Sequence, residues 1–134
     1  MEHKVLVVDD RQEIRDLLAD ILKTRGYQVS TATDGYDALT QFALDRPDLL
    51  ITDLTMPGMD GYELCRITRG ISSVPIMVVT AQLGSGARSK ALAAGAGAFV
   101  TKPFDLGDFW SQVEAMLNVN SMHHILQEQV LHTQ

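Results

Sequence analysis

The chain of 134 residues has a formal net charge of −6, 46% hydrophobic and 21% charged residues, and a single cysteine. These values are typical of one globular domain, and the length leaves no room for a second. The acidic balance argues against direct nucleic-acid binding, and one cysteine excludes an internal disulfide. No signal peptide or membrane-length apolar run is recognisable, so we expect a cytoplasmic protein with no membrane contact.

Apolar runs of strand length alternate with segments of helical period, which is typical of a parallel α/β sheet. The first predicted strand covers residues 4–8. The helix that follows carries one apolar stripe and ends at Gly26, where glycine most easily takes a left-handed cap. That stripe consists of Ile14, Leu17, Leu18, Ile21 and Leu22.

The next two units repeat this pattern. A strand over 27–32 precedes a helix over 35–45, and a strand over 48–52 precedes a helix that starts at Asp60. Asp60 and Glu63 have the form of a capping box with aspartate as the cap. The inward residues of the second helix are expected to be Ala38, Leu39, Phe42 and Ala43.

The last two units are shorter. A strand ends before Thr80, a helix is expected over about 87–94, and the fifth strand over 98–101. Two glycines within 81–86 disfavour helix there, so the fourth helix should start late. The fifth helix opens at Asp105, with one apolar face made of Leu106, Phe109, Trp110, Val113 and Leu117.

Right-handed crossovers with helices on both faces require the winding to reverse once. The resulting fold class is a flavodoxin-like (βα)5 doubly wound parallel sheet with strand order 2-1-3-4-5, in which Asp9, Asp10 and Asp53 meet at the switch point. No glycine-rich phosphate loop follows the first strand, where Asp9-Asp10-Arg-Gln stands instead. A dinucleotide or flavin site is therefore disfavoured.

The residues at the strand ends suggest one chemistry. Carboxylates about 4 Å apart repel by roughly 4 kcal/mol at an effective dielectric near 20, so Asp9, Asp10 and Asp53 need a cation or raised pKa values. Mg²⁺ suits hard oxygen ligands and binds through one or two carboxylates plus phosphate oxygens. Thr80 adds a hydroxyl and Lys102 a positive charge, and together these groups match the needs of phosphoryl transfer.

Four motifs in order then resemble the receiver domain of bacterial two-component response regulators. They are Val-Val-Asp9-Asp10, Asp53-Leu-Thr-Met-Pro-Gly-Met-Asp60-Gly61, Val-Val-Thr80-Ala81, and Gly95-Ala96 followed by Phe99-Val-Thr-Lys102-Pro103-Phe104. The resemblance extends over about residues 3–118.

The resemblance implies that Asp53 accepts a phosphoryl group from a histidine kinase or phosphotransfer protein. It also implies a Mg²⁺ site formed by Asp9, Asp10 and Asp53, with Asp9 acting partly through water, and by the backbone carbonyl of Thr55. Lys102 would pair with a phosphoryl oxygen.

The resemblance further assigns a switch and a structural feature. Thr80 would move toward the phosphoryl group, Phe99 would turn inward with it, and the face made by the fourth helix, fifth strand and fifth helix would change. The Lys102–Pro103 peptide bond would be cis. The domain would be a signalling module with self-catalysed phosphorylation and slow autodephosphorylation, and not an enzyme.

Two alternatives stay open from the sequence. A haloacid-dehalogenase-type phosphatase also forms a phospho-aspartate beside Mg²⁺, but it carries a second acid two residues on, where this chain has Thr55. A stand-alone binding module would not need the full set of site residues. The sequence predicts a receiver domain over 1–118 and a tail over 119–134, interpreted as a linker or as a short helix that docks or dimerises.

Overall fold

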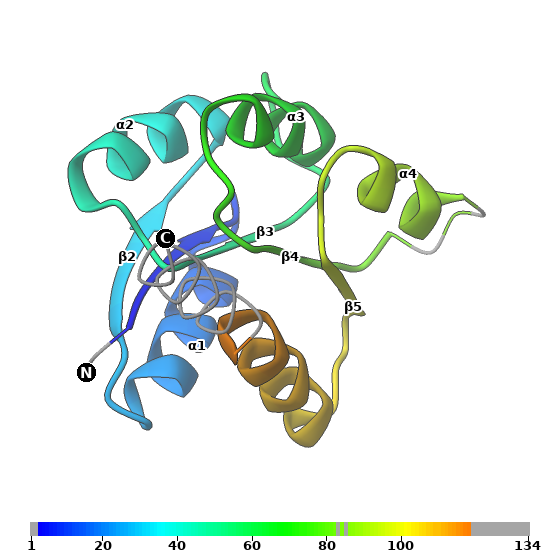
Figure 1. Ribbon diagram of the computed structural model, residues 1–134. Coiled ribbons are helices and arrows are strands. Elements are labelled where there is room, and N and C mark those ends of the chain that lie inside the picture. Colours follow the sequence, from blue (N-terminus) through cyan, green and yellow to red (C-terminus); the bar gives the residue numbers. More distant parts are fainter. Residues whose placement is uncertain (1–2, 83, 85, 119–134) are drawn as a thin grey trace, which may run out of the picture.

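The protein forms a five-stranded parallel sheet in the order β2-β1-β3-β4-β5 (Figure 1). This computed structural model describes residues 3–82, 84 and 86–118. The strands are β1 (Lys4–Val8), β2 (Gln28–Ala32), β3 (Leu49–Thr52), β4 (Ile76–Thr80) and β5 (Ala98–Thr101). The helices are α1 (Gln12–Lys23), α2 (Gly35–Asp45), α3 (Gly61–Ile71), α4 (Ala87–Ala93) and one over 106–118, here called the C-terminal helix. The predicted fold class and strand order are confirmed.

Helices cover both faces of the sheet (Figure 1). α2, α3 and α4 lie on one face, and α1 lies on the other beside the C-terminal helix, drawn in gold to orange. The strand side chains alternate between the two layers, so Val5 and Val7 join one buried cluster while Leu6 and Val8 join the other. Burial on both faces explains why the strands read as continuous apolar runs.

The sheet register places the ends of the strands at one edge. Val8 of β1 lies opposite Ala32 of β2 and Thr52 of β3. The pairing continues one residue further, because the backbone N–H of Asp53 donates to the carbonyl of Val8 at 3.1 Å. In the same way, the N–H of Lys102 donates to the Thr80 carbonyl at 2.8 Å. Hydrogen bonds that continue the sheet therefore fix the backbones of Asp53 and Lys102, which directly follow β3 and β5.

Helix starts follow the predicted signals. Asp60 caps α3 by accepting a hydrogen bond from the Glu63 N–H at 2.9 Å, and Asp105 accepts one from the Asp108 N–H at 3.2 Å. α4 begins only at Ala87, after Gly86 with a φ of 90°. The predicted late start of the fourth helix is confirmed.

Some predicted boundaries and buried positions are wrong. The second and third strands begin one residue later than expected, at Gln28 and Leu49, and α4 ends at Ala93. Ala43 is exposed beside the 73% exposed Leu44, because it lies at the outer margin of the α2 stripe.

Two leucines assigned to buried helix faces are also half exposed. Leu17 is 49% exposed and Leu106 is 50% exposed. Both line a groove of about 520 Å³ where α1 meets the segment that follows β5. Helical period marks the apolar side of a helix, but it does not tell whether a neighbouring helix covers the edge of that side.

Cys65 on α3 is fully buried, and burial raises the pKa of its thiol to about 11. This thiol therefore packs as a small apolar side chain. Within the described part of the chain, no helix combines the length and apolar character needed to cross a bilayer.

Gly61 provides a sharp test of how α3 is joined to the sheet. Its N–H donates to the Leu54 carbonyl at 2.9 Å, and an added Cβ would overlap the Asp53 carbonyl and lie 2.7 Å from the Leu54 Cα. We expect Gly61→Ala to lower the free energy of unfolding by about 1–3 kcal/mol, because the backbone of Asp53 and Leu54 would have to move to make room for the added methyl group.

Gly70 in the same helix is the matched control, since a Cβ there meets nothing within 4 Å. Gly70→Ala should raise stability by up to about 1 kcal/mol through helix propensity. Urea unfolding of both variants measures the difference, and equal stabilities would contradict the tight contact at Gly61.

Candidate functional site

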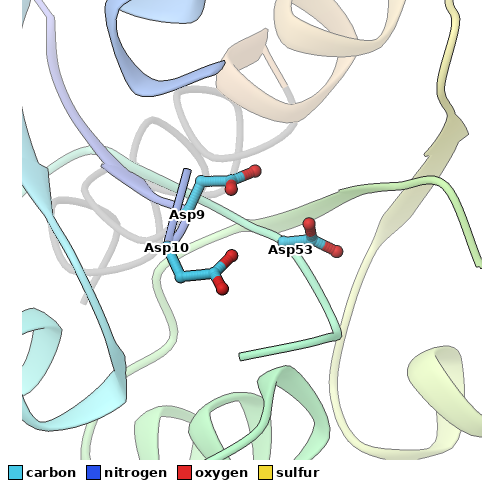
Figure 2. A group of neighbouring side chains, drawn as sticks. All are labelled: Asp9, Asp10 and Asp53. Carbon is cyan, nitrogen blue, oxygen red and sulfur yellow. The ribbon is translucent and has the colours of Figure 1, made fainter. Parts of the chain in front are cut away.

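Four side chains from four strand ends converge at one edge of the sheet. Asp9 follows β1, Asp53 follows β3, Thr80 ends β4 and Lys102 follows β5. Asp9 and Thr80 are each 1% exposed and Asp53 is 8% exposed. Figure 2 shows the carboxylates of Asp9 and Asp10 extending toward the side on which Asp53 lies. The structure thus brings together residues that are up to 93 positions apart in the chain.

The ammonium group of Lys102 links two of the carboxylates. Its Nζ lies 2.7 Å from Oδ2 of Asp9 and 3.0 Å from Oδ2 of Asp53, and its side chain is only 12% exposed. Charged hydrogen bonds of this length are strong, particularly away from water. Lys102 therefore ties the ends of β1, β3 and β5 to one point.

Backbone groups hold the other carboxylate oxygens. Oδ1 of Asp9 accepts from the Arg11 N–H at 3.0 Å. Oδ1 of Asp53 accepts from the Leu54 N–H at 2.6 Å and the Thr55 N–H at 3.3 Å. Asp9 and Asp53 are thus fixed at both oxygens.

Asp10 differs from its two neighbours. Its side chain is exposed, and within residues 3–82, 84 and 86–118 no group donates a hydrogen bond to its carboxylate. Its oxygens are therefore available to a ligand.

The pKa directions follow from this arrangement. Burial raises the pKa of Asp9, and the hydrogen bonds from Lys102 and the Arg11 N–H offset only part of that rise. Burial also acts to raise the pKa of Asp53, but the nearby Thr80 hydroxyl and Lys102 outweigh it and hold that pKa below its usual range. Burial disfavours charge on Lys102, yet the two carboxylates raise its pKa. At neutral pH the site holds an ionised Asp53 and a protonated Lys102.

The three aspartates have a geometry that fits a divalent cation. One carboxylate oxygen from each of Asp9, Asp10 and Asp53 can be chosen so that all lie within 4.8 Å of one another. Hard oxygen donors suit Mg²⁺, and the free carboxylate of Asp10 supplies the open ligand. Because both oxygens of Asp9 are already engaged, contact through a water molecule suits Asp9 better than direct ligation.

A pocket of about 400 Å³ opens over these groups. Its lining residues are Asp10, Arg11, Asp53, Thr55, Thr80, Ala81 and Gln82. Sequence reasoning did not name Arg11 as a site residue, although it directly follows the acidic pair. The pocket is large enough for a phosphoryl group and several waters.

Phe99 and Pro103 lie outside this pocket. Phe99 is half-buried against the cluster beneath α2, α3 and α4, and it lines a separate pocket of about 350 Å³ beside Gln82 and the start of α4. The Lys102–Pro103 peptide bond is cis, as predicted.

Removing Lys102 tests the balance of charges in this site. Lys102→Met leaves Asp9 and Asp53 without their shared cation, and losing one member of a buried ionic group typically costs about 3–5 kcal/mol. The variant's carboxylates would have raised pKa values, so its stability deficit should be large at pH 7, shrink as pH falls through those raised values, and be mostly gone below about 4, where a carboxyl group of the unfolded chain also binds its proton. Mg²⁺ should restore part of the loss at pH 7.

Chemical unfolding across pH, with and without Mg²⁺, measures this effect. The exposed Lys23 on α1 gives the control variant Lys23→Met, which should show little change in stability. A Lys102→Met deficit that is independent of pH would rule out unpaired carboxylates as its cause.

Comparisons with known proteins identify the family of the chain. The family model described as "Response regulator receiver domain" matches residues 5–114. The response regulator MprA of Mycobacterium tuberculosis (strain ATCC 25618 / H37Rv) is 42% identical over 118 residues, which cover 87% of this chain and 51% of MprA. The chain thus spans about half the length of the curated relatives it matches.

Solved structures show the same fold. The chemotaxis protein CheY4 of Vibrio cholerae has a TM-score of 0.82 at 32% identity, covering 87% of this chain and 100% of CheY4. The BeF3-activated N-terminal receiver domain of Klebsiella pneumoniae RstA has a TM-score of 0.82 at 28% identity, covering 85% and 97%. The chain belongs to the receiver domain family of two-component response regulators and is a signalling domain of that family.

Proposed function

We propose that Asp53 accepts a phosphoryl group from the phosphohistidine of a sensor histidine kinase or phosphotransfer protein. The observation that carries this proposal is the position of the Asp53 carboxylate, which is ionised, opens to a pocket and lies 3.0 Å from Lys102. A carboxylate oxygen forms the bond to phosphorus while the bond from phosphorus to the imidazole nitrogen breaks. The imidazole keeps the electron pair of the broken bond, and it leaves as a neutral ring because its other nitrogen carries a proton.

The surrounding groups then neutralise and orient the phosphoryl oxygens. Lys102 donates to one oxygen and the Thr80 hydroxyl to another, so donors already in place meet the charge of the transferred group. Mg²⁺ would be held by Asp10 and Asp53, by Asp9 through water, and by the Thr55 carbonyl. When bound, the ion balances the negative charge of the transferred group.

The site favours a lasting signal over rapid turnover. A phosphatase of the haloacid dehalogenase type needs a second carboxylate two residues after the nucleophile to activate water, and Thr55 occupies that position. We therefore expect slow autodephosphorylation. A pure binding module would have no use for an ionised Asp53 between Lys102 and a cation site.

The signal would be read through the α4 side of the domain. Thr80 ends β4 beside Asp53, and Phe99 on the neighbouring strand is only half-buried beside a pocket. Thr80 moving toward the phosphoryl group would open space into which Phe99 turns. α4 starts late after glycines, which lowers the cost of moving it.

The donor protein would dock beside the pocket. The apolar groove lined by Leu17 and Leu106 shares Arg11 and Ala81 with the phosphoryl pocket. We propose that residues 1–118 act as a cytoplasmic receiver without direct contact to nucleic acid or membrane. The interpretation of 119–134 as a linker, with homodimerisation as the alternative, lies outside the described residues.

Asp53→Asn tests the central step. With Mg²⁺ and acetyl phosphate, the wild-type chain should gain one phosphoryl group by intact mass, whereas Asp53→Asn should gain none because an amide is not a nucleophile here. Omitting Mg²⁺ should also prevent wild-type labelling. Equal labelling of Asp53→Asn would overturn the assignment of the acceptor.

Substitutions in the groove test donor docking. Leu17→Asp and Leu106→Asp place charge on an apolar docking surface, and each should slow phosphotransfer from a phosphohistidine protein by about tenfold, roughly 1.4 kcal/mol. The matched control is Leu44→Asp, since Leu44 is 73% exposed on α2.

Acetyl phosphate should label all three leucine variants at the wild-type rate, because a small donor needs no groove. If the protein donor is equally slowed by Leu44→Asp, the groove is not the docking site.

A further inference from the structure

Arg15 makes a contact to the acidic cluster that the chemistry above does not use. It lies on α1, where it is half-buried, and its Nη1 donates to the backbone carbonyl oxygen of Asp9 at 2.7 Å. This carbonyl belongs to the peptide group that joins Asp9 to Asp10. Arg15 therefore fixes the plane of the peptide between the two acids.

Asp10 has no other means of orientation in the described part of the chain. The side chain of Asp9 is held at one oxygen by the Arg11 N–H and at the other by Lys102, whereas no described group donates to the carboxylate of Asp10. The direction of the Asp10 side chain therefore depends on the conformation of its backbone. A twist of the preceding peptide would swing that carboxylate away from Asp53.

We propose that Arg15 is a positioning residue for the cation site. By holding the Asp9 carbonyl, it keeps the Asp10 carboxylate within reach of the cation that Asp53 also faces. The proposal rests on the proposed Mg²⁺ site. A guanidinium suits this task because it stays charged at any physiological pH and donates in a fixed plane.

A simple electrostatic role predicts the opposite result. Arg15 is a positive charge next to a site for a positive ion, so its Coulomb effect alone disfavours cation binding. Removing the charge should then tighten Mg²⁺ binding. If Arg15 positions Asp10, removing it should weaken Mg²⁺ binding despite the lost repulsion. The sign of the change separates the two roles.

Calorimetric titration of the unphosphorylated full chain with MgCl2 provides the test. We expect Arg15→Met to weaken Mg²⁺ binding several-fold. Arg15→Lys keeps the charge but not the planar donor, and it should also bind Mg²⁺ more weakly than wild type. Arg66→Met, which removes an exposed arginine from α3, is the matched control for net charge and should leave affinity unchanged or slightly tighter.

A metal-free measurement supports the same test. Amide hydrogen exchange at Asp10 and Arg11 should be faster in Arg15→Met than in wild type or Arg66→Met. If Arg15→Met does not fold, Arg15→Lys decides by the same two measurements.

The outcomes separate the two proposals. Wild-type binding of Mg²⁺ with equal or tighter binding by the Arg15 variants overturns the positioning role alone. Failure of the wild-type chain to bind Mg²⁺ overturns the proposed cation site, and with it this inference.

Discussion

The structure of the site depends on one ammonium group placed between two buried carboxylates. Lys102 reaches Asp9 and Asp53 at 2.7 and 3.0 Å, and it thereby joins the ends of three strands. Buried ionic groups are weak evidence for stability, because desolvation commonly costs as much as the attraction returns. A hydrophobic cluster of similar volume would serve folding equally well. The charges are better explained by the proposed chemistry of the pocket, in which an ionised acceptor carboxylate and a fixed positive charge must lie side by side.

The sheet lowers the loss of conformational entropy that is needed to bring the site residues together. The Asp53 N–H bonds to the Val8 carbonyl, and the Lys102 N–H bonds to the Thr80 carbonyl, so the site residues continue the ladder by one position. Their backbones are already ordered by burial of the strands on both faces. Gly61 adds a close approach of α3 to the loop after β3. Only side-chain freedom remains to be lost when the polar groups meet.

Much of this architecture could be predicted from the sequence. The spacing of apolar residues predicts the helices and strands, and the residues that follow each strand predict the site. The alternation of strand-length apolar runs with helical segments predicted a parallel sheet, and the residues directly after the first, third and fifth strands identified Asp9, Asp53 and Lys102 as site residues. The contrast between Asp9, whose pKa is raised, and Asp53, whose pKa is lowered, could not be predicted. It depends on which backbone N–H and hydroxyl groups reach each oxygen.

The same limit applies to residues that act across elements. Arg15 looks like an ordinary polar residue of an amphipathic helix, and its bond to the Asp9 carbonyl appears only once α1 is placed. Leu17 and Leu106 fall on apolar stripes, yet both are half exposed because the groove between their elements is not filled by described side chains. Local period determines the face of a helix, and the packing of neighbours determines what that face contacts.

Charge balance connects the resting site to its proposed phosphorylated form. With a formal charge of −1 on each of the three aspartates and +1 on Lys102, the site sums to −2, which one divalent cation would balance. Transfer of a phosphoryl group to Asp53 replaces a singly charged carboxylate by a group of nearly two negative charges. The added charge would draw both Lys102 and the Thr80 hydroxyl, which already lies within hydrogen-bonding reach of Asp53. In the proposed mechanism, the added charge at the end of β4 would move Thr80 and then Phe99 beside it, and phosphorylation of Asp53 would change the packing at α4.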